Sequence, residues 1–190
     1  MNISDLKAYC NNPKNKTMVD VGLFIILILS FHFIYLGWQT LEYWPVNNLI
    51  MNLFDKASAL LFDQTCWVLS HVFGIDIATS GRSIAAVNCE GYYSHITIAP
   101  ECTSLKQWLH WLFLMLLFPG PWKHKAWYIP LGLIIIELIN VIRTSGILTL
   151  LLYWPDKFNF FHDYLFKTFF YVVIFLMWVV WTEKFNIKKK

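Results

Sequence analysis

Charged residues are scarce in this chain. They make up 14% of its 190 residues, and 57% of the residues are hydrophobic. About a quarter of the residues in a soluble domain are charged, so an ordinary soluble domain is excluded and an integral membrane protein is indicated. A hydrocarbon core about 30 Å thick takes about 20 apolar residues per helix, so the length allows about four to six spans. Internal repeats and low-complexity tracts are also lacking, and we expect residues 1–190 to form a single membrane-embedded domain.

Paired cysteine motifs are lacking too. The four cysteines, at positions 10, 66, 89 and 102, include no C-x-x-C pair. Neither a zinc site nor a thioredoxin-type redox site is therefore indicated, and we expect no metal and no cofactor. The first apolar run, residues 18–36, lacks a small-x-small cleavage site and is longer than the apolar region of a signal peptide, so we expect a permanent helix. The expected surroundings are membrane lipids, with no role for nucleic acid.

Four apolar runs are candidates to cross the membrane: residues 18–36, 105–118, 127–152 and 161–181. Lysines precede the first run, follow the second, and follow the last. Because positively charged residues favour the cytoplasmic side, we expect the N-terminal segment 1–17 and the basic tail 183–190 in the cytoplasm. The number of crossings is then even, which four spans satisfy.

Residues 46–77 carry apolar side chains at helical spacing, interrupted by charged groups such as Asp55, Lys56 and Asp63. Burying each of these charges in lipid would cost about 2.5–3.5 kcal/mol. The pattern favours one or two amphipathic helices at the outer interface. A true span that turns its polar face into the bundle is the other interpretation.

Two short runs rich in β-branched and aromatic residues follow, 83–88 and 92–98, and Pro100 ends the second. They are typical of a small hairpin, and residues 46–101 then form an extracytoplasmic or interfacial insert. The expected fold is all-α and polytopic. It has about four transmembrane helices, interfacial amphipathic helices and a small extracytoplasmic β-hairpin.

Three polar residues far apart in the sequence are expected at one depth. Cys102 begins the helix that descends to residue 118, and His162 begins the last helix, so both lie at the outer end. Arg143 is about 24 Å up its helix from the inner boundary expected at residue 127. A thiolate is a nucleophile, an imidazole can carry its proton, and a guanidinium can stabilise an oxyanion. These types suit a cysteine nucleophile at the outer membrane surface.

Each of the three has further readings. Lys106, one helical turn after Cys102, is expected on the same face and would favour the thiolate. A disulfide between Cys102 and Cys89 would abolish the nucleophile instead. Arg143 could snorkel to the outer headgroups or pair with Glu137. His162 could be an ordinary interfacial histidine.

A transport or binding protein is the alternative from a different functional class. Glu137, Asn140 and Arg143 recur every three residues on one helix and could line a polar path for an ion or solute. Four spans are few for a transporter, so that function would need an oligomer. A third interpretation is an assembly factor that has this fold but no catalytic activity.

The order of the motifs adds a resemblance. A C-[ST]-x-[LI]-[KR] segment opens one helix, an N-x-x-R motif ending at Arg143 follows near the outer end of the next, and His162 opens the last. The first segment here reads Cys102-Thr103-Ser104-Leu105-Lys106. Over roughly residues 20–182 the chain resembles the exosortase/archaeosortase family of membrane-embedded cysteine transpeptidases, in its compact bacterial form.

By position, the resemblance implies that Cys102 is the nucleophile, Arg143 the essential arginine and His162 the histidine of the site. The supporting or substrate-binding residues would be Glu101, Thr103, Ser104, Lys106 and Asn140. The chain departs from the family's usual A-C-S-G-[LI] segment. Ser104 replaces a glycine, and Glu101 adds a negative charge beside the thiol.

The resemblance also implies a substrate and a place. The site would face outward from the bacterial cytoplasmic membrane. Its substrates would be exported proteins that end in a short recognition motif (PEP-like in the best-known systems), a transmembrane helix and a basic tail. Attack by Cys102 would form a thioester and release the helix and tail. An amine or water would then resolve the thioester, with transfer to a lipid or cell-surface acceptor as the expected outcome.

Overall fold

A computed structural model describes residues 15–87, 91 and 93–186 of the chain. This part contains five α-helices and three short strands. The helices are α2 (Lys16–Thr40), α3 (Asn47–His71), α4 (Leu105–Leu117), α5 (Trp122–Tyr153) and α6 (Phe166–Trp181), and the strands are β1 (Asp76–Ser80), β2 (Ser83–Val87) and β3 (Tyr93–Thr97).

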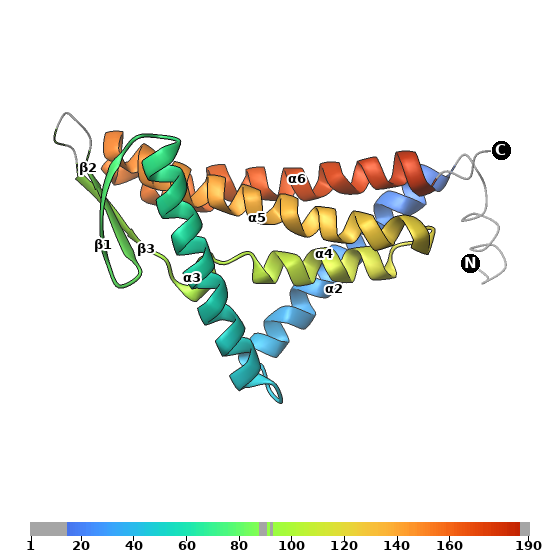
Figure 1. The fold of residues 1–190 in the computed structure, drawn as a ribbon. Helices are drawn as coiled ribbons and strands as arrows, with labels where there is room; N and C mark the ends of the chain where they lie inside the picture. The colour runs from blue at the N-terminus through green and yellow to red at the C-terminus, as the bar shows by residue number, and fades with distance from the viewer. Residues whose placement is uncertain (1–14, 88–90, 92, 187–190) are drawn as a thin grey trace.

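Helices α4, α5 and α6 lie side by side with their axes roughly parallel, and α2 crosses them obliquely (Figure 1). The start of α2 and the end of α6 lie at the same end of this bundle, and the sheet lies at the other end (Figure 1). Helix α3 leaves the far end of α2 and slants back to the sheet (Figure 1). We call the end that carries the sheet the sheet end, and the opposite end the open end.

Within the described residues, three helices are long and apolar enough to cross a membrane: Lys16–Thr40, Trp122–Tyr153 and Thr168–Phe185. Helix α4 has only 13 residues, about 20 Å, so the expected count of four full spans is not confirmed. Its start is later than expected because Thr103 is extended, with ψ of 158°, so that Ser104 becomes the N-cap. Helix α4 still reaches the open end, where the Lys125 Nζ of α5 donates to the carbonyl of Phe118 at 2.7 Å.

Aromatic side chains hold the bundle together near the open end. Gly132 of α5 leaves room for Trp111 of α4, because a Cβ at position 132 would overlap the indole ring. The Trp111 Nε1 donates to the carbonyl of Ile129 at 3.2 Å, and the Tyr128 hydroxyl donates to the carbonyl of Met177 in α6 at 2.6 Å. Helix α5 is therefore bonded to both of its neighbours.

The sheet is larger than the expected hairpin. It has three antiparallel strands in the order β1–β2–β3. Strand β1 begins at Asp76, so the last two residues of the stretch 46–77, which was expected to be helical, belong to the sheet. The turn between β1 and β2 contains Gly81 with φ of +59°, a conformation that favours glycine. Residues 88–90 and 92, at the centre of the expected hairpin, lie outside the described residues.

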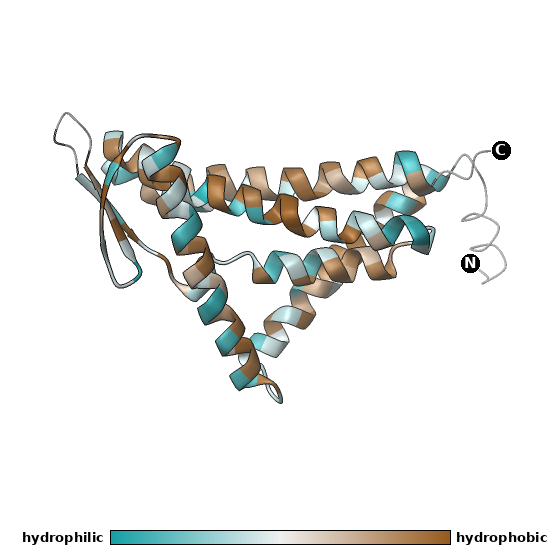
Figure 2. Cartoon of the chain, in the orientation of Figure 1, coloured by the Kyte–Doolittle hydropathy of each residue, from teal (hydrophilic) through white to brown (hydrophobic). Residues whose placement is uncertain are grey.

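One helix, α3, fills most of the stretch 46–77 and buries a single stripe. Its buried residues, Ser58, Leu61, Thr65 and Leu69, recur at helical spacing. Leu61 and Leu69 pack in a cluster with residues of the sheet and of α5. The other face of α3 mixes hydrophobic and hydrophilic residues (Figure 2). Helix α3 is not among the helices that could span by length and composition, which agrees with an amphipathic helix.

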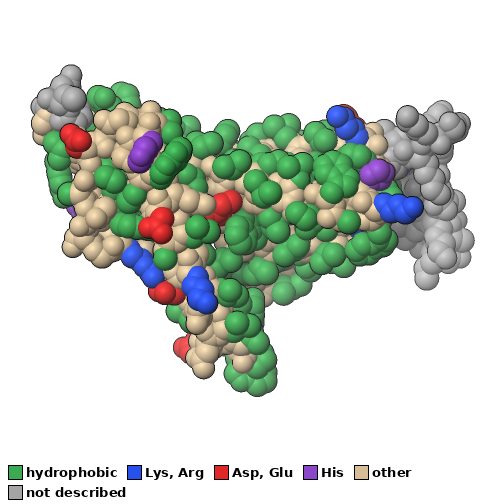
Figure 3. Space-filling view, viewed as in Figure 1, with side chains coloured by type: hydrophobic (Ala, Val, Ile, Leu, Met, Phe, Trp, Pro, Cys, Tyr) green, Lys and Arg blue, Asp and Glu red, His purple; other side chains and the backbone are tan. Residues whose placement is uncertain are grey.

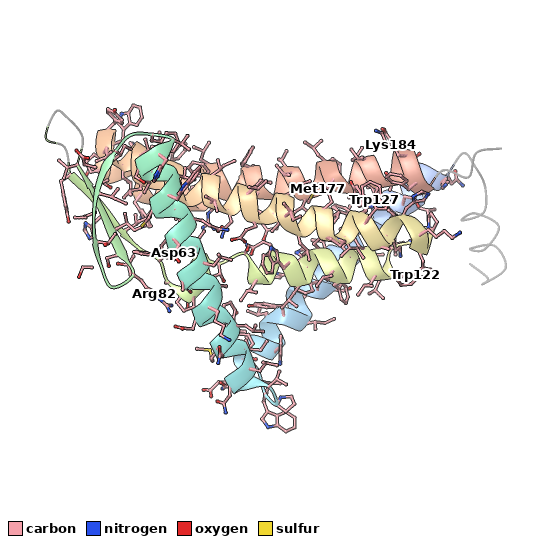
Figure 4. All side chains as sticks on the ribbon, in the orientation of Figure 1. Asp63, Arg82, Trp122, Trp127, Met177 and Lys184 are labelled. Carbon is pink, nitrogen blue, oxygen red and sulfur yellow. The ribbon has the colours of Figure 1, made fainter. Side chains whose placement is uncertain are left out.

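The surface divides by charge. On the face seen in Figure 3, hydrophobic side chains cover the middle of the bundle, and charged side chains gather near its two ends and along α3. Trp122, Trp127 and Lys184 lie together at the open end (Figure 4). Arg82 lies beside α3 (Figure 4), where its guanidinium pairs with the exposed carboxylate of Asp55 at 2.5 Å. The apolar middle of the bundle is what a membrane-embedded protein requires.

Candidate functional site

A cavity of about 210 Å³ lies where β3, α5 and the segment before α6 meet. Of the described residues, ten from four parts of the chain line it: His95, Ile96, Thr97, Ile98, Cys102, Arg143, Thr144, Ile147, Phe158 and His162. The thiol, guanidinium and imidazole singled out from the sequence therefore share one cavity. They come from three segments that are separated by 41 and 19 positions (143 − 102 and 162 − 143).

A short turn ahead of α4 positions Cys102. Residues Pro100–Cys102 form a 3₁₀ turn, in which the amide of Cys102 donates to the carbonyl of Ala99 at 3.0 Å. The hydroxyl of Thr103 donates to the carbonyl of Pro100 at 2.7 Å and closes the turn. Cys102 is half-buried and its thiol is free. It precedes the N-cap of α4 by two residues, so it does not open the helix as expected, and the helix dipole acts on it less than on a first-turn residue.

Polar side chains of α5 hold the segment around Cys102 and reach His162. Glu137, Asn140 and Arg143 lie on one side of α5 because they are three residues apart. The Ser104 hydroxyl donates to the carboxylate of Glu137. The Asn140 Nδ2, which is buried, donates to the carbonyl of Cys102 at 3.0 Å. Helix α5 thus fixes the backbone on which the thiol is carried.

His162 lies in a π-helical turn, Phe160–Leu165, just before α6. Such turns are rare and are often found at functional sites. The Phe158 ring stacks on the imidazole, with centroids 5.3 Å apart. The Arg143 Nη2 lies 2.8 Å from the His162 Nε2. Because a guanidinium can only donate, Nε2 is the acceptor in this contact.

Two residues expected beside the thiol do not line the cavity. The Lys106 Nζ lies over the ring of Tyr35 in α2, 4.8 Å from the centroid, which is a cation–π contact. Glu101 is exposed and does not line the cavity. Thr103 and Ser104 are buried, and both bond within the scaffold of the site.

Strand β3 forms a cavity wall that the sequence did not reveal. The sequence pattern does not single out His95, and it indicates for residues 92–98 only a strand of the expected hairpin. One signal was present, because Thr97 precedes Cys102 by five residues. Five residues span at most about 18 Å, so the end of this strand had to lie near the thiol.

The other described cysteine differs from Cys102. Cys66 lies on α3, outside the cavity, and burial, together with the nearby Asp63 carboxylate, raises the pKa of its thiol. Such a thiol is a poor nucleophile at neutral pH. Cys10 and Cys89 lie outside the described residues, and so does the disulfide considered for Cys89. Within the described ranges, no group of three His, Cys, Asp or Glu side chains could hold a metal ion.

Comparison with known families decides the relationship. A family model described as transmembrane exosortase matches residues 12–179. The chain belongs to the transmembrane exosortase family. The match includes every residue that lines the cavity, so the site lies within the shared domain of this exosortase. Neither the comparison with curated proteins nor that with solved structures found a match.

Membership sets the general activity of this exosortase. The family implies a membrane cysteine peptidase or transpeptidase that acts on exported proteins. The resemblance noted from the motif order is therefore confirmed at the level of the family.

Proposed function

We propose that this exosortase cleaves C-terminal sorting signals of exported proteins through a thioester on Cys102 and transfers them to an acceptor. The observation that carries the proposal is the shared cavity of Cys102, Arg143 and His162. Cysteine transpeptidation needs a nucleophile, a proton carrier and an oxyanion partner. The cavity offers one group of each kind, from three separate segments.

The first half-reaction forms the thioester. The Cys102 thiol gives its proton to the His162 imidazole, and the Sγ attacks the scissile carbonyl carbon. The Arg143 guanidinium donates to the oxyanion of the tetrahedral intermediate, an interaction that is strong in a site with little water. The carbon–nitrogen bond then breaks, and His162 returns the proton to the leaving amine. That amine carries away the substrate's helix and tail.

The bond between Arg143 and His162 describes the resting state. While the Arg143 Nη2 donates to Nε2, the lone pair of the imidazole is occupied and cannot accept the thiol proton. A substrate carbonyl that enters the cavity offers the guanidinium a better-placed acceptor. Arg143 then turns to the carbonyl, and Nε2 becomes a base. Substrate binding thus switches on the nucleophile.

The second half-reaction releases the product. An acceptor amine, or water, attacks the thioester carbonyl while His162 takes its proton, and the thiol is restored. The exported protein leaves with a new C-terminus. We expect the substrate to carry a short PEP-like motif, one membrane-spanning helix and a basic tail. We place the cavity on the outer side of the bacterial cytoplasmic membrane and the open end of the bundle in the cytoplasm.

The polar row on α5 favours this function over transport. A solute path needs polar groups directed at a solute, whereas Glu137 accepts from Ser104 and Asn140 donates to the carbonyl of Cys102. These bonds hold a reactive segment in place. They explain the row without a path across the membrane.

Co-expression tests the proposal. Exported reporters that end in a PEP-like motif, an apolar helix and a basic tail are expressed with the wild-type chain, and their new C-termini are identified by mass spectrometry. We expect Cys102→Ala to lower cleavage by at least about 10³-fold, since loss of a nucleophile removes the covalent route. The matched control is Cys66→Ala, which removes the other free thiol of the described chain and should cleave normally. Full cleavage by Cys102→Ala would refute the proposal.

A further inference from the structure

Strand β3 is an edge of the sheet. Among the residues that the structure describes, the strand order is β1–β2–β3, so β3 pairs with a neighbouring strand on one side only. Edge strands expose backbone donors and acceptors, and proteins often block them with proline or lysine. Residues Tyr93–Thr97 read YSHIT and contain neither. This edge is chemically open to another extended chain.

The register shows which backbone groups face outward. The amide of Ile98 donates to the carbonyl of Arg82 at 2.9 Å, which makes this pair a hydrogen-bonded one. Because antiparallel pairs alternate, Ile96 and Ser94 also bond to β2. The amide and carbonyl groups of Tyr93, His95 and Thr97 are therefore directed away from β2, toward the open edge.

The open edge borders the cavity. Four consecutive residues, His95 to Ile98, line it. Successive side chains of a strand point to opposite faces, so a cavity on one face would meet only every second residue. A cavity that meets all four residues is not confined to one face of the strand, which agrees with a position along the edge, beside the backbone. Cys102, four residues after Ile98, lines the same cavity.

We propose that the substrate segment preceding the scissile bond binds as a fourth strand on the open edge of β3, parallel to it. This inference rests on the proposed function and names how that site takes its substrate. Backbone hydrogen bonds to His95 and Thr97 hold the segment, and its C-terminal end enters the cavity beside Cys102. Main-chain pairing of this kind gives affinity, and pockets for alternate side chains give specificity.

The chain direction sets the parallel orientation. From β3 the chain passes Cys102 and enters α4, which runs from the sheet end to the open end (Figure 1). A substrate with motif, helix and tail passes its scissile bond and enters the membrane in the same direction. The two chains therefore run the same way past the thiol. A lipid tail would leave the outward amides of β3 without acceptors, so a peptide suits this edge better.

Cross-linking tests the orientation. Tyr93→Cys or Thr97→Cys is introduced into a chain in which Cys10, Cys66, Cys89 and Cys102 are alanine. The partner is a reporter that wild type cleaves, with a single cysteine moved along the segment outside its helix. We expect the reporter position that couples to residue 93 to lie about four residues before the one that couples to residue 97, as parallel pairing requires. The reverse order, or coupling without preferred positions, would overturn the inference while cleavage by wild type upholds the proposed function.

Proline substitution tests the hydrogen bonds. His95→Pro removes an outward amide of β3, and we expect it to cleave the reporter at least about tenfold more slowly than His95→Ala. Thr79→Pro is the matched control. By the same alternation, its amide faces outward on β1, the other edge, so cleavage should match wild type. Labelling of Cys102 by a small thiol reagent reports whether each variant keeps its site. Equal cleavage by His95→Pro and His95→Ala would contradict the inference.

Discussion

The two halves of α5 use polar side chains in different ways. In the first half, residues 122–136, Lys125 and Tyr128 donate to backbone carbonyls at the end of α4 and within α6. In the second half, residues 137–153, Asn140 and Arg143 reach a 3₁₀ turn and a π-helical turn. The first set ties helices together, and the second positions irregular segments that carry reactive groups. Stability and chemistry should therefore be separable by substitutions along one helix.

Arg143→Gln should give the largest effect, in the second half. Loss of an oxyanion donor costs about 10²–10³-fold in rate, so cleavage should fall by that factor while the thermal midpoint changes little. The rate of thioester formation on a reporter measures the effect. Arg82→Gln is the control, because the Arg82 guanidinium pairs with Asp55 at the surface and neither residue lines the cavity. Equal rates for the two variants would show that Arg143 does not stabilise the oxyanion.

Gly132→Ala should give the next effect, in the first half. Its new Cβ overlaps the indole of Trp111, and overpacking of this kind costs about 1–3 kcal/mol of unfolding free energy. The thermal midpoint in detergent should fall by several degrees, with the rate per folded molecule unchanged. Gly22→Ala adds the same atom where nothing lies within 4 Å and should leave the midpoint in place. A loss of rate without a loss of stability would contradict the division of α5.

Asn140→Ala should have a smaller effect on the chemistry. It leaves the Cys102 carbonyl without its donor, which costs about 1 kcal/mol. We expect kcat to fall about fivefold with KM nearly constant, because the thiol is held less well. Thr149→Val, which removes a hydroxyl bonded to the carbonyl of Ser145 within α5, is the control. If KM rises instead, Asn140 contacts the substrate.

Lys106→Gln should give the smallest effect. Lys106 is half-buried and its ammonium contacts the ring of the buried Tyr35, and a cation–π contact of this kind contributes about 0.5–2 kcal/mol. Cleavage should stay within about twofold of wild type, and the thermal midpoint should fall by a few degrees at most. A large shift in the pH dependence of cleavage would instead indicate that Lys106 acts on the Cys102 thiol.

Local patterns predicted much of this molecule. The long apolar runs gave α2, α5 and most of α6, because hydrophobicity over about 20 residues is a strong signal. The motif order pointed to Cys102, Arg143 and His162, which the structure brings into one cavity. These features depend on residues that are close in sequence, or on residue types that the motifs require.

Contacts between distant segments were not predictable in this way. Strand β1 has few apolar residues, and its place depends on pairing with β2. The start of α4 depends on Ser104, whose partner Glu137 lies 33 positions away. Lys106 contacts Tyr35, which lies on α2, 71 positions earlier in the sequence (106 − 35). In each case the local sequence allows more than one conformation, and a contact with a residue distant in sequence determines which conformation forms.

The shortness of α4 has a consequence for the surrounding lipid. At about 20 Å it falls short of a hydrocarbon layer about 30 Å thick. A bilayer must thin beside it, or leave the thiol below the headgroups. We expect acyl-chain length to regulate how readily water and polar acceptors reach the proposed thioester, so that the membrane itself would take part in the choice between hydrolysis and transfer.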